Sequence, residues 1–319
     1  MTLASFARRR VLQALVTLVA LTLVVHAGIS LIGGDPVRAL FGFVPPSPAE
    51  LAELRARYGL DQPYPAQYLA YLTQLLRGNL GVTISLTPQP VTSVVAATLP
   101  TTAFLIGIGL VLQVTTAYGV AVVTMLRRNK LVSALTWWLA VAATAAPVIF
   151  TAWALRSYFT LGYGGRDWFP YRYDGTAGAY VLPLIALVAM LAGPVILLFR
   201  SELLDTLRST FTKFAVASGH SDLRIVGVHA AKASAGPVIA YLGASLGYLM
   251  TGVVIVEAIY DIPGVGNLIL DSIARRDRAV VVGGVLVISV LAILGGMTAD
   301  IVAATLDPRL RLEGDGPPH

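Results

Sequence analysis

The sequence predicts an all-α integral membrane protein with six transmembrane helices. Apolar residues make up 56% of the 319 residues and charged residues only 13%, whereas roughly 25% is typical of a soluble domain. So few charges could not cover a soluble fold of this size. The composition therefore excludes a soluble enzyme and a disordered chain, and the lack of cysteine excludes a disulfide scaffold and thiolate chemistry.

Six apolar stretches reach the length of about 20 residues that a transmembrane helix needs. They run near Val11–Ile32, Leu99–Leu126, Leu131–Leu155, Tyr180–Phe199, Pro237–Val256 and Ala279–Thr305. The first follows three arginines as a signal peptide would, but it is longer than a signal h-region and lacks a cleavage site, so we interpret it as a retained span. Pro147, Pro183 and Pro194 lie within spans and should kink them.

Lysine and arginine indicate the orientation, because they concentrate on the cytosolic side of membrane proteins. With the N-terminus in the cytosol, the cytosolic segments carry 13 basic and six acidic residues, and the outer segments carry ten of each. Both termini are therefore expected to be cytosolic.

The first outer loop is expected to fold as a small helical cap. Ser47-Pro48-Ala49-Glu50 is a capping box with proline at the first helical position, and Gly59 is suited to end that helix. A second helix follows Pro65, with apolar residues at helical spacing, and ends at Gly78. A plain solvated loop is the alternative.

The last outer loop contains the turn-rich sequence Ile262-Pro263-Gly264-Val265-Gly266. A short apolar helix over Leu268–Ile273 follows, and we expect it to enter the protein at membrane depth. The tail after Arg311 is expected to be disordered.

The stretch Arg200–Gly236 is longer than a connection between two spans requires. It is predicted to form a helix, a break at Gly219, and a second helix with Ser221 as its N-cap. We expect this loop to dock a cytosolic partner. An amphipathic helix on the membrane surface is the alternative.

Motifs that carry chemistry are missing from the sequence. It contains no P-loop and no H-E-x-x-H, and its four histidines have no metal-ligand spacing. Gly243–Gly247 matches the G-x-S-x-G pattern around Ser245, but the hydrolase motif needs a strand-to-helix elbow and a histidine. Close packing of helices through small residues is the better interpretation.

Two polar residues within spans need a role. Asp300 is the one acidic residue inside a span and lies near its cytosolic end, which favours a structural pair or cap over a proton relay. His26 in the first span is expected to form a hydrogen bond between helices.

Several fragments carry a family resemblance through their order and spacing. They are Phe6-Ala7-Arg8-Arg9, Gly33-Gly34-Asp35-Pro36, the run from Arg57 to Leu72, Gly78-Asn79-Leu80-Gly81, Leu99-Pro100-Thr101-Thr102, Ile262–Gly266 and Leu306-Asp307-Pro308-Arg309. Over nearly its whole length the chain resembles the inner-membrane permease subunit of dipeptide/oligopeptide (and nickel) ATP-binding-cassette (ABC) importers. The resemblance implies a type I ABC importer permease core.

The resemblance assigns the long cytosolic loop as the coupling helix, which sits in a groove of the ATPase. The family motif is roughly Ala-x-Ala-x-Gly with a proline 18 residues after the glycine, matched here by Ala215, Ala217, Gly219 and Pro237. The implied coupling residues are Phe211, Lys213, Ala215, Ala217, Gly219, His220, Asp222, His229 and Pro237. Val216, Ser218 and Gly236 depart from the family pattern, as does the start Thr210-Phe211.

The resemblance also implies an organisation of the chain and its partners. Residues 1–32 form the cytosolic N-terminus and first span, 33–98 the extracytoplasmic loop, 99–306 a permease core of five spans with the coupling loop at 200–236, and 307–319 a cytosolic tail. The implied partners are a second homologous permease, two ATP-binding subunits or domains, and an extracytoplasmic substrate-binding protein. The chain itself would bind no cofactor, and ATP and Mg would bind the partner ATPases.

Peptides are the substrates that the resemblance favours, with nickel, haem or another small solute as alternatives. The residues that line the path are not indicated by the sequence. Two other functional classes are alternatives. An ion-driven secondary transporter would favour inverted repeats and several intramembrane charges, and an intramembrane hydrolase would need a histidine beside Ser245.

Overall fold

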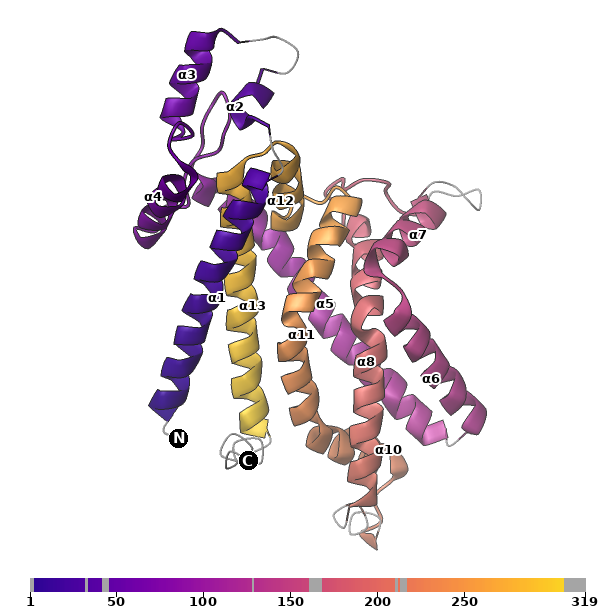
Figure 1. Cartoon of the computed structure of the whole chain (residues 1–319). Coiled ribbons are helices and arrows are strands. Elements are labelled where there is room, and N and C mark those ends of the chain that lie inside the picture. The colour runs from indigo at the N-terminus through magenta and orange to yellow at the C-terminus, as the bar shows by residue number, and fades with distance from the viewer. Residues whose placement is uncertain are drawn as a thin grey trace. The chain divides into compact units, whose positions relative to one another are not determined.

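The computed structural model describes residues 3–31, 34–41, 46–127, 129–160, 168–209, 212 and 217–306 (Figure 1). Within these residues the regular structure is helical, apart from an isolated antiparallel bridge between Val82 and Pro90. The predicted all-α class is confirmed.

The helices divide into two compact units. Unit 1 comprises Met1–Ala103 and Pro263–Leu291, and unit 2 comprises Phe104–Ile262 and Ala292–His319. Two long helices, α5 (Val91–Arg127) and α13 (Arg278–Leu306), contribute residues to both units.

Five single helices are long and apolar enough to cross a membrane. They are α1 (Leu3–Leu31), α5, α8 (Val181–Arg208), α11 (Ala231–Ile259) and α13. The third predicted span is sharply bent, as expected from Pro147: α6 (Lys130–Ala145) and α7 (Val148–Thr160) meet at 101° and amount to a sixth span only as a pair.

The break between α6 and α7 follows from Pro147. Proline lacks a backbone N–H and disfavours helical geometry in the residue before it, and Ala146 accordingly has an extended backbone with φ −81° and ψ 116°. In contrast, α8 continues as one helix through Pro194. The same residue type therefore ends one helix and is accommodated within another.

The helical cap predicted between the first two spans is present in unit 1. It consists of α2 (Pro36–Ala39), α3 (Pro48–Arg57) and α4 (Tyr64–Leu76). The capping box is confirmed: Ser47 N–H donates to Glu50 Oε2 at 2.8 Å, and Glu50 N–H donates to Ser47 Oγ at 3.2 Å. Gly59 follows α3 with a φ of +64°, which glycine adopts readily.

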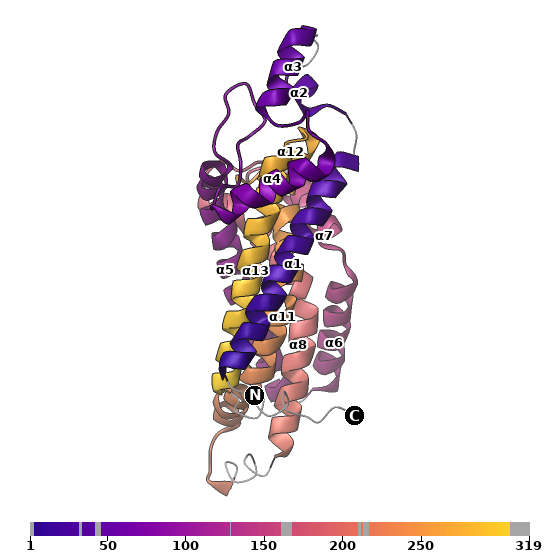
Figure 2. The same cartoon turned by 60° about the vertical axis from the view of Figure 1, so that its left-hand side comes forward.

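The predicted hydrogen bond of His26 is not formed. His26 is 6% exposed, and neither ring nitrogen has a hydrogen-bond partner among the described residues. Instead, its ring packs against three tyrosines of α4, with centroid distances of 5.1 Å to Tyr64, 5.4 Å to Tyr68 and 6.0 Å to Tyr71. Figure 2 shows α4 crossing α1 near one end of that helix.

The core of unit 1 gathers apolar side chains from α1, α4, α5, α12 (Val265–Ala274) and α13. Two glycines let α13 approach its neighbours. A Cβ atom at Gly283 would lie 2.8 Å from Val91, and one at Gly284 would lie 2.6 Å from Ile269 of α12. The predicted short helix after the Pro-Gly turn is thus confirmed as α12, with Val265, Gly266, Ile269 and Ser272 buried.

Unit 2 has two apolar clusters. The first is centred on α8 and the second half of α11, where Leu187, Met190 and Val253 are buried. The second joins α5, the later part of α8 and the start of α11. The second cluster supports the long connection between α8 and α11, which contains most of the residues predicted to be functional.

Candidate functional site

A segment of residues 209–230 connects α8 to α11 and contains most of the residues predicted for coupling. It leaves α8 in a turn fixed by hydrogen bonds: the Ser209 N–H donates to the Thr206 carbonyl at 3.0 Å. The buried Thr212 donates its hydroxyl to the same carbonyl at 2.7 Å. One carbonyl in the last turn of α8 therefore accepts from two donors of the segment.

An exposed turn follows over residues 217–224, every one of which is exposed. Gly219 has a φ of +77°, and a Cβ atom there would meet nothing within 4 Å. Ser221 accepts from the Arg224 N–H at 3.4 Å and caps α10 (Asp222–Arg224). The break at Gly219 and the N-cap at Ser221 are thus confirmed.

The turn does not pass directly into α11. A π-helical stretch, η2 (Ile225–Ala230), lies between them, which the sequence analysis did not anticipate. Wide turns of this kind are uncommon and occur often at functional sites. The Tyr118 hydroxyl on α5 donates to the Gly227 carbonyl within this stretch.

The π-helical stretch η2 packs against α5 and α8. Val226 and Ala230 are buried in the cluster that includes Phe199 and Leu203 of α8 and Val122 of α5. The hydroxyl of Ser234, at the start of α11, donates to the Ala230 carbonyl at 2.8 Å and lies 3.5 Å from Thr206 Oγ1. A displacement of the exposed turn would therefore act on α5, α8 and α11 together.

The residues predicted for coupling divide into two groups. Ala217, Gly219, His220 and Asp222 lie together on the exposed turn. His229 belongs to η2, and Pro237 lies within α11 and is partly buried. The predictions for Phe211, Lys213 and Ala215 fall outside the described residues.

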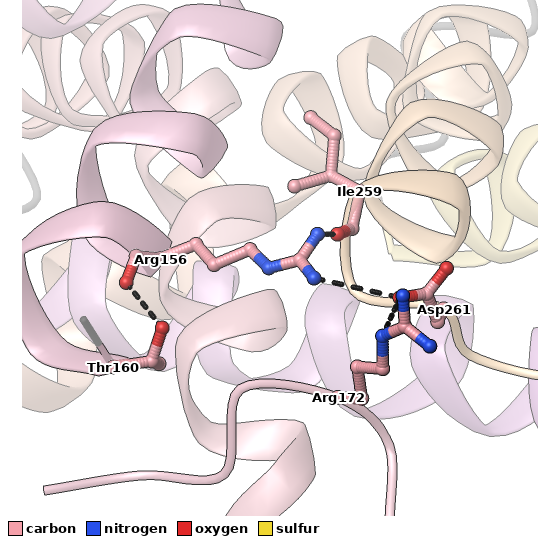
Figure 3. Close-up of polar contacts among 5 residues, drawn as sticks. All are labelled: Arg156, Thr160, Arg172, Ile259 and Asp261. Carbon is pink, nitrogen blue, oxygen red and sulfur yellow. Dashed lines mark hydrogen bonds and ion pairs between the residues drawn. The ribbon is translucent and has the colours of Figure 1, made fainter. Parts of the chain in front are cut away.

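A second polar cluster lies at the end of α7 and was missed by the sequence analysis (Figure 3). Arg156 donates to the Ile259 carbonyl at the end of α11, and its Nη2 lies 3.4 Å from Asp261 Oδ2. Arg172 Nε lies 3.3 Å from the same oxygen, so two arginines share one carboxylate. The Arg156 side chain is only 13% exposed, whereas that of Arg172 is 74% exposed.

Tyrosines lie beside the arginine cluster. The Arg156 guanidinium lies 4.0 Å from the centre of the Tyr171 ring, a cation–π contact. The Tyr260 hydroxyl donates to the Ala152 carbonyl at 2.9 Å, and the Tyr173 N–H donates to the Tyr260 carbonyl at 3.2 Å. Through these contacts α7, residues 168–176 and the end of α11 are fixed to one another.

Asp261 is the residue of this cluster that the sequence could have indicated. It has a φ of +54°, a conformation that Asp and Asn tolerate better than other non-glycine residues. The residue lies five positions after the fifth apolar stretch and directly precedes the Ile-Pro-Gly turn. Its two arginine partners come from a different part of the sequence, and only the fold identifies them.

Ser245 is placed as the packing interpretation predicts. Its hydroxyl donates to the Leu242 carbonyl of its own helix at 3.0 Å. The neighbouring Gly243 faces α13, where a Cβ atom would lie 2.5 Å from the Ala299 Cβ. The small residues of the G-x-S-x-G match therefore permit close helix contact.

Comparison with known proteins adds independent information. A family model described as "binding-protein-dependent transport system inner membrane component" matches residues 92–312, and a model for the N-terminal part of such components matches residues 3–105. The chain is 28% identical to a putative peptide permease of Brucella suis, covering 95% of this chain and 98% of the relative.

Two further relatives are similar over equally long stretches. A glutathione transport system permease protein of Salmonella paratyphi A is 28% identical, with 96% of this chain and 99% of the relative covered. A di/tripeptide transport system permease protein of Pseudomonas aeruginosa is 30% identical, with 96% and 98% covered.

Proposed function

We propose that this chain, which belongs to the family of binding-protein-dependent transport system inner membrane components, is the permease subunit of an ABC importer for peptides. The peptide assignment is supported by relatives named as permeases for peptides, glutathione and di- or tripeptides. The family explains the apolar helices and the inner-membrane location.

The exposed turn 217–224 is the observation that carries the proposal, because it has the properties of a coupling element. Its backbone at Gly219 is free of surrounding side chains, so a partner surface can approach closely. The turn continues into η2, whose residues Val226 and Ala230 are buried in the core of unit 2. In our proposal the turn enters a groove of an ATPase subunit and transmits movement to α5, α8 and α11.

We infer a transport cycle in which partner subunits supply the energy. ATP and Mg bind and react on two ATP-binding subunits, and this chain supplies no catalytic group. A second homologous permease completes the path, and an extracytoplasmic binding protein delivers the substrate. ATP binding closes the ATPases and moves the coupling turns, so the two ends of the path open alternately.

The coupling role also sets the orientation. The turn 217–224 faces the cytosol in our proposal, in agreement with the excess of lysine and arginine that the positive-inside rule assigns to that side. Both termini are then cytosolic. Reaction of single introduced cysteines with a membrane-impermeant thiol reagent tests this directly, because the chain has no native cysteine.

Co-purification tests the proposed complex. The chain is tagged at its C-terminus, extracted from native membranes in mild detergent, and its companions are identified by mass spectrometry. We expect a homologous permease and ATPases with a Walker A motif. Recovery of the chain alone from several detergents would contradict the proposal and favour an ion-driven transporter, with Asp300 as the first residue to neutralise.

Uptake measurements test the substrate. A strain that lacks this chain should lose ATP-dependent uptake of a labelled dipeptide or tripeptide and recover it on complementation. Unchanged peptide uptake with lost uptake of nickel or haem would retain the permease and overturn the peptide assignment.

A further inference from the structure

We propose that a pocket between α6 and α8 binds the phosphate headgroup of an anionic phospholipid. The pocket is an open hollow of about 370 Å³ within unit 2. It is lined by Lys130, Ser133, Ala134, Trp137, Trp138 and Arg200. The basic side chains of Lys130 and Arg200 therefore lie close to two tryptophans on the surface of these two helices.

The helical repeat of α6 brings its lining residues to one face. Lys130, Ser133, Ala134 and Trp137 are separated by three, one and three positions, the spacing of neighbours on a helix surface. Asn129 caps α6, since its Oδ1 accepts from the Leu131 N–H at 2.8 Å. Lys130 is therefore held in the first turn, where the helix dipole favours an anion.

Arg200 completes the pocket from α8. Its guanidinium donates to the Ser133 carbonyl at 3.3 Å and to Ser133 Oγ at 2.5 Å. A guanidinium has five N–H donors, and its planar fork matches a phosphate group. Across the described part of the chain, no carboxylate forms an ion pair with Lys130 or Arg200.

The two helices pack closely about two turns away from the pocket. Gly193 of α8 lies directly against the backbone of Ala140 of α6. Ser133 and Arg200 are each seven residues from this contact, or about 10 Å along their helices. The two helices, which lie side by side in Figure 1, are thus held together at one level and leave a hollow two turns away.

The surroundings favour a lipid as the source of the phosphate. Leu131, Leu135 and Leu139 of α6 are 76%, 59% and 61% exposed, an apolar surface that suits acyl chains in an inner-membrane protein. Trp137 and Trp138 are also exposed, with ring centroids 4.8 Å apart, and tryptophan is enriched at the membrane–water boundary. Basic pockets between transmembrane helices recognise anionic headgroups.

Native mass spectrometry of the purified full chain tests the proposal. Phosphatidylglycerol, phosphatidylcholine and inorganic phosphate are added separately, and the retained adducts are measured. We expect phosphatidylglycerol to be retained preferentially and Lys130→Gln to weaken its binding about fivefold, the effect of one basic residue near an anionic headgroup. Arg127→Gln is the matched control, because Arg127 is exposed near Lys130 but does not line the pocket.

Three results would overturn the proposal. The first is equal retention of phosphatidylcholine and phosphatidylglycerol, and the second is an equal effect of Lys130→Gln and Arg127→Gln. The third is displacement of the lipid by micromolar inorganic phosphate, which would assign the pocket to a soluble anion.

A second measurement leaves both basic side chains of the pocket in place. Brominated phosphatidylglycerol in vesicles should quench the fluorescence of Trp137 and Trp138, and the double substitution Trp137→Phe, Trp138→Phe should remove most of the lipid-specific quenching. Undiminished quenching in the double variant would place the bound lipid elsewhere.

Discussion

Asp277 and Ile84 connect two segments of unit 1 that are 193 positions apart in the sequence: the Ile84 N–H donates to Asp277 Oδ2 at 2.7 Å. The other carboxylate oxygen accepts from the Val280 N–H at 3.3 Å and so caps the first turn of α13. Asp277 is 6% exposed. Burial raises the pKa of this carboxyl above its ordinary value of 3.8, although the backbone hydrogen bonds act in the opposite direction.

The raised pKa predicts how stability depends on pH. Between 3.8, the ordinary pKa, and the higher folded value, the folded chain binds more protons than the unfolded chain, so stability falls as the pH rises. Asp277→Asn removes this titration. The thermal midpoint of the wild type, measured against that of Asp277→Asn in detergent, should therefore decrease as the pH rises from about 3 to 6. A difference that stays constant or increases would contradict the assignment.

Gly193→Ala should destabilise the chain, because the new methyl group would press against the backbone of Ala140 and the hydroxyl of Thr144 on α6. Overpacking of this kind costs about 1–3 kcal/mol. Gly247→Ala is the control, since nothing lies within 4 Å of its added methyl group. Thermal unfolding in detergent should separate the two variants, and equal midpoints would show that α6 and α8 do not pack as described.

Gly219→Glu should leave the chain inserted in the membrane and abolish ATP-driven uptake. The glutamate side chain would occupy the space where we propose that the ATPase approaches. Membrane abundance and peptide uptake are measured together, and uptake at the wild-type rate would exclude a coupling role for this turn.

The control for Gly219→Glu must share its backbone strain, because a residue other than glycine at positive φ costs about 1–2 kcal/mol. Gly175 has a φ of +81°, is exposed and is also free of neighbours within 4 Å. Gly175→Glu should retain the ATPase in co-purification, whereas Gly219→Glu should lose it. Loss of the ATPase from both variants would point to a general folding defect.

Tyr118→Phe should loosen the link between η2 and α5 without unfolding the chain. The substitution removes the hydroxyl that donates to the Gly227 carbonyl, and a hydrogen bond of this kind contributes about 0.5–1.5 kcal/mol. In the reconstituted complex, more ATP should be hydrolysed per peptide transported. Tyr248→Phe, an exposed tyrosine of α11, serves as the control, and an identical ratio in both variants would contradict the prediction.

The two arginines on Asp261 should differ in importance. Arg156 donates to a backbone carbonyl, pairs with Asp261 and stacks on Tyr171, and lysine cannot reproduce this geometry. Arg156→Lys should cost about 1.5–3 kcal/mol, the range for hydrogen bonds to charged groups. Arg172→Lys should change stability by less than about 1 kcal/mol, because its pair is exposed. Similar thermal midpoints for both variants would show that Arg156 has no special role.

Much of the fold could be predicted because it depends on local signals. The capping box at Ser47, the positive φ of Gly59 and Gly219 and the N-cap at Ser221 are each set by a few neighbouring residues. Long apolar stretches likewise determine where a helix can span a membrane. These features need no knowledge of distant contacts.

Other features depend on contacts that the sequence does not reveal. Pro147 separates two helices, whereas Pro194 sits inside one, and the residue type alone does not distinguish these outcomes. His26 is enclosed by tyrosines from α4 in place of the hydrogen bond expected for it. The partners of Arg156 come from α11 and from the segment near Tyr171, far away in the sequence.

The π-helical stretch η2 has a consequence for the length of the chain around it. A π turn contains more residues than an α turn because its hydrogen bonds span five positions instead of four. Because a π turn takes up one more residue than an α turn, deleting one residue from Ile225–Ala230 would restore an ordinary α turn and leave the flanking segments nearly unchanged in direction. The same deletion within α11 would rotate the exposed turn by about 100° relative to the far part of that helix. A single-residue deletion should therefore impair this permease less within Ile225–Ala230 than within α11.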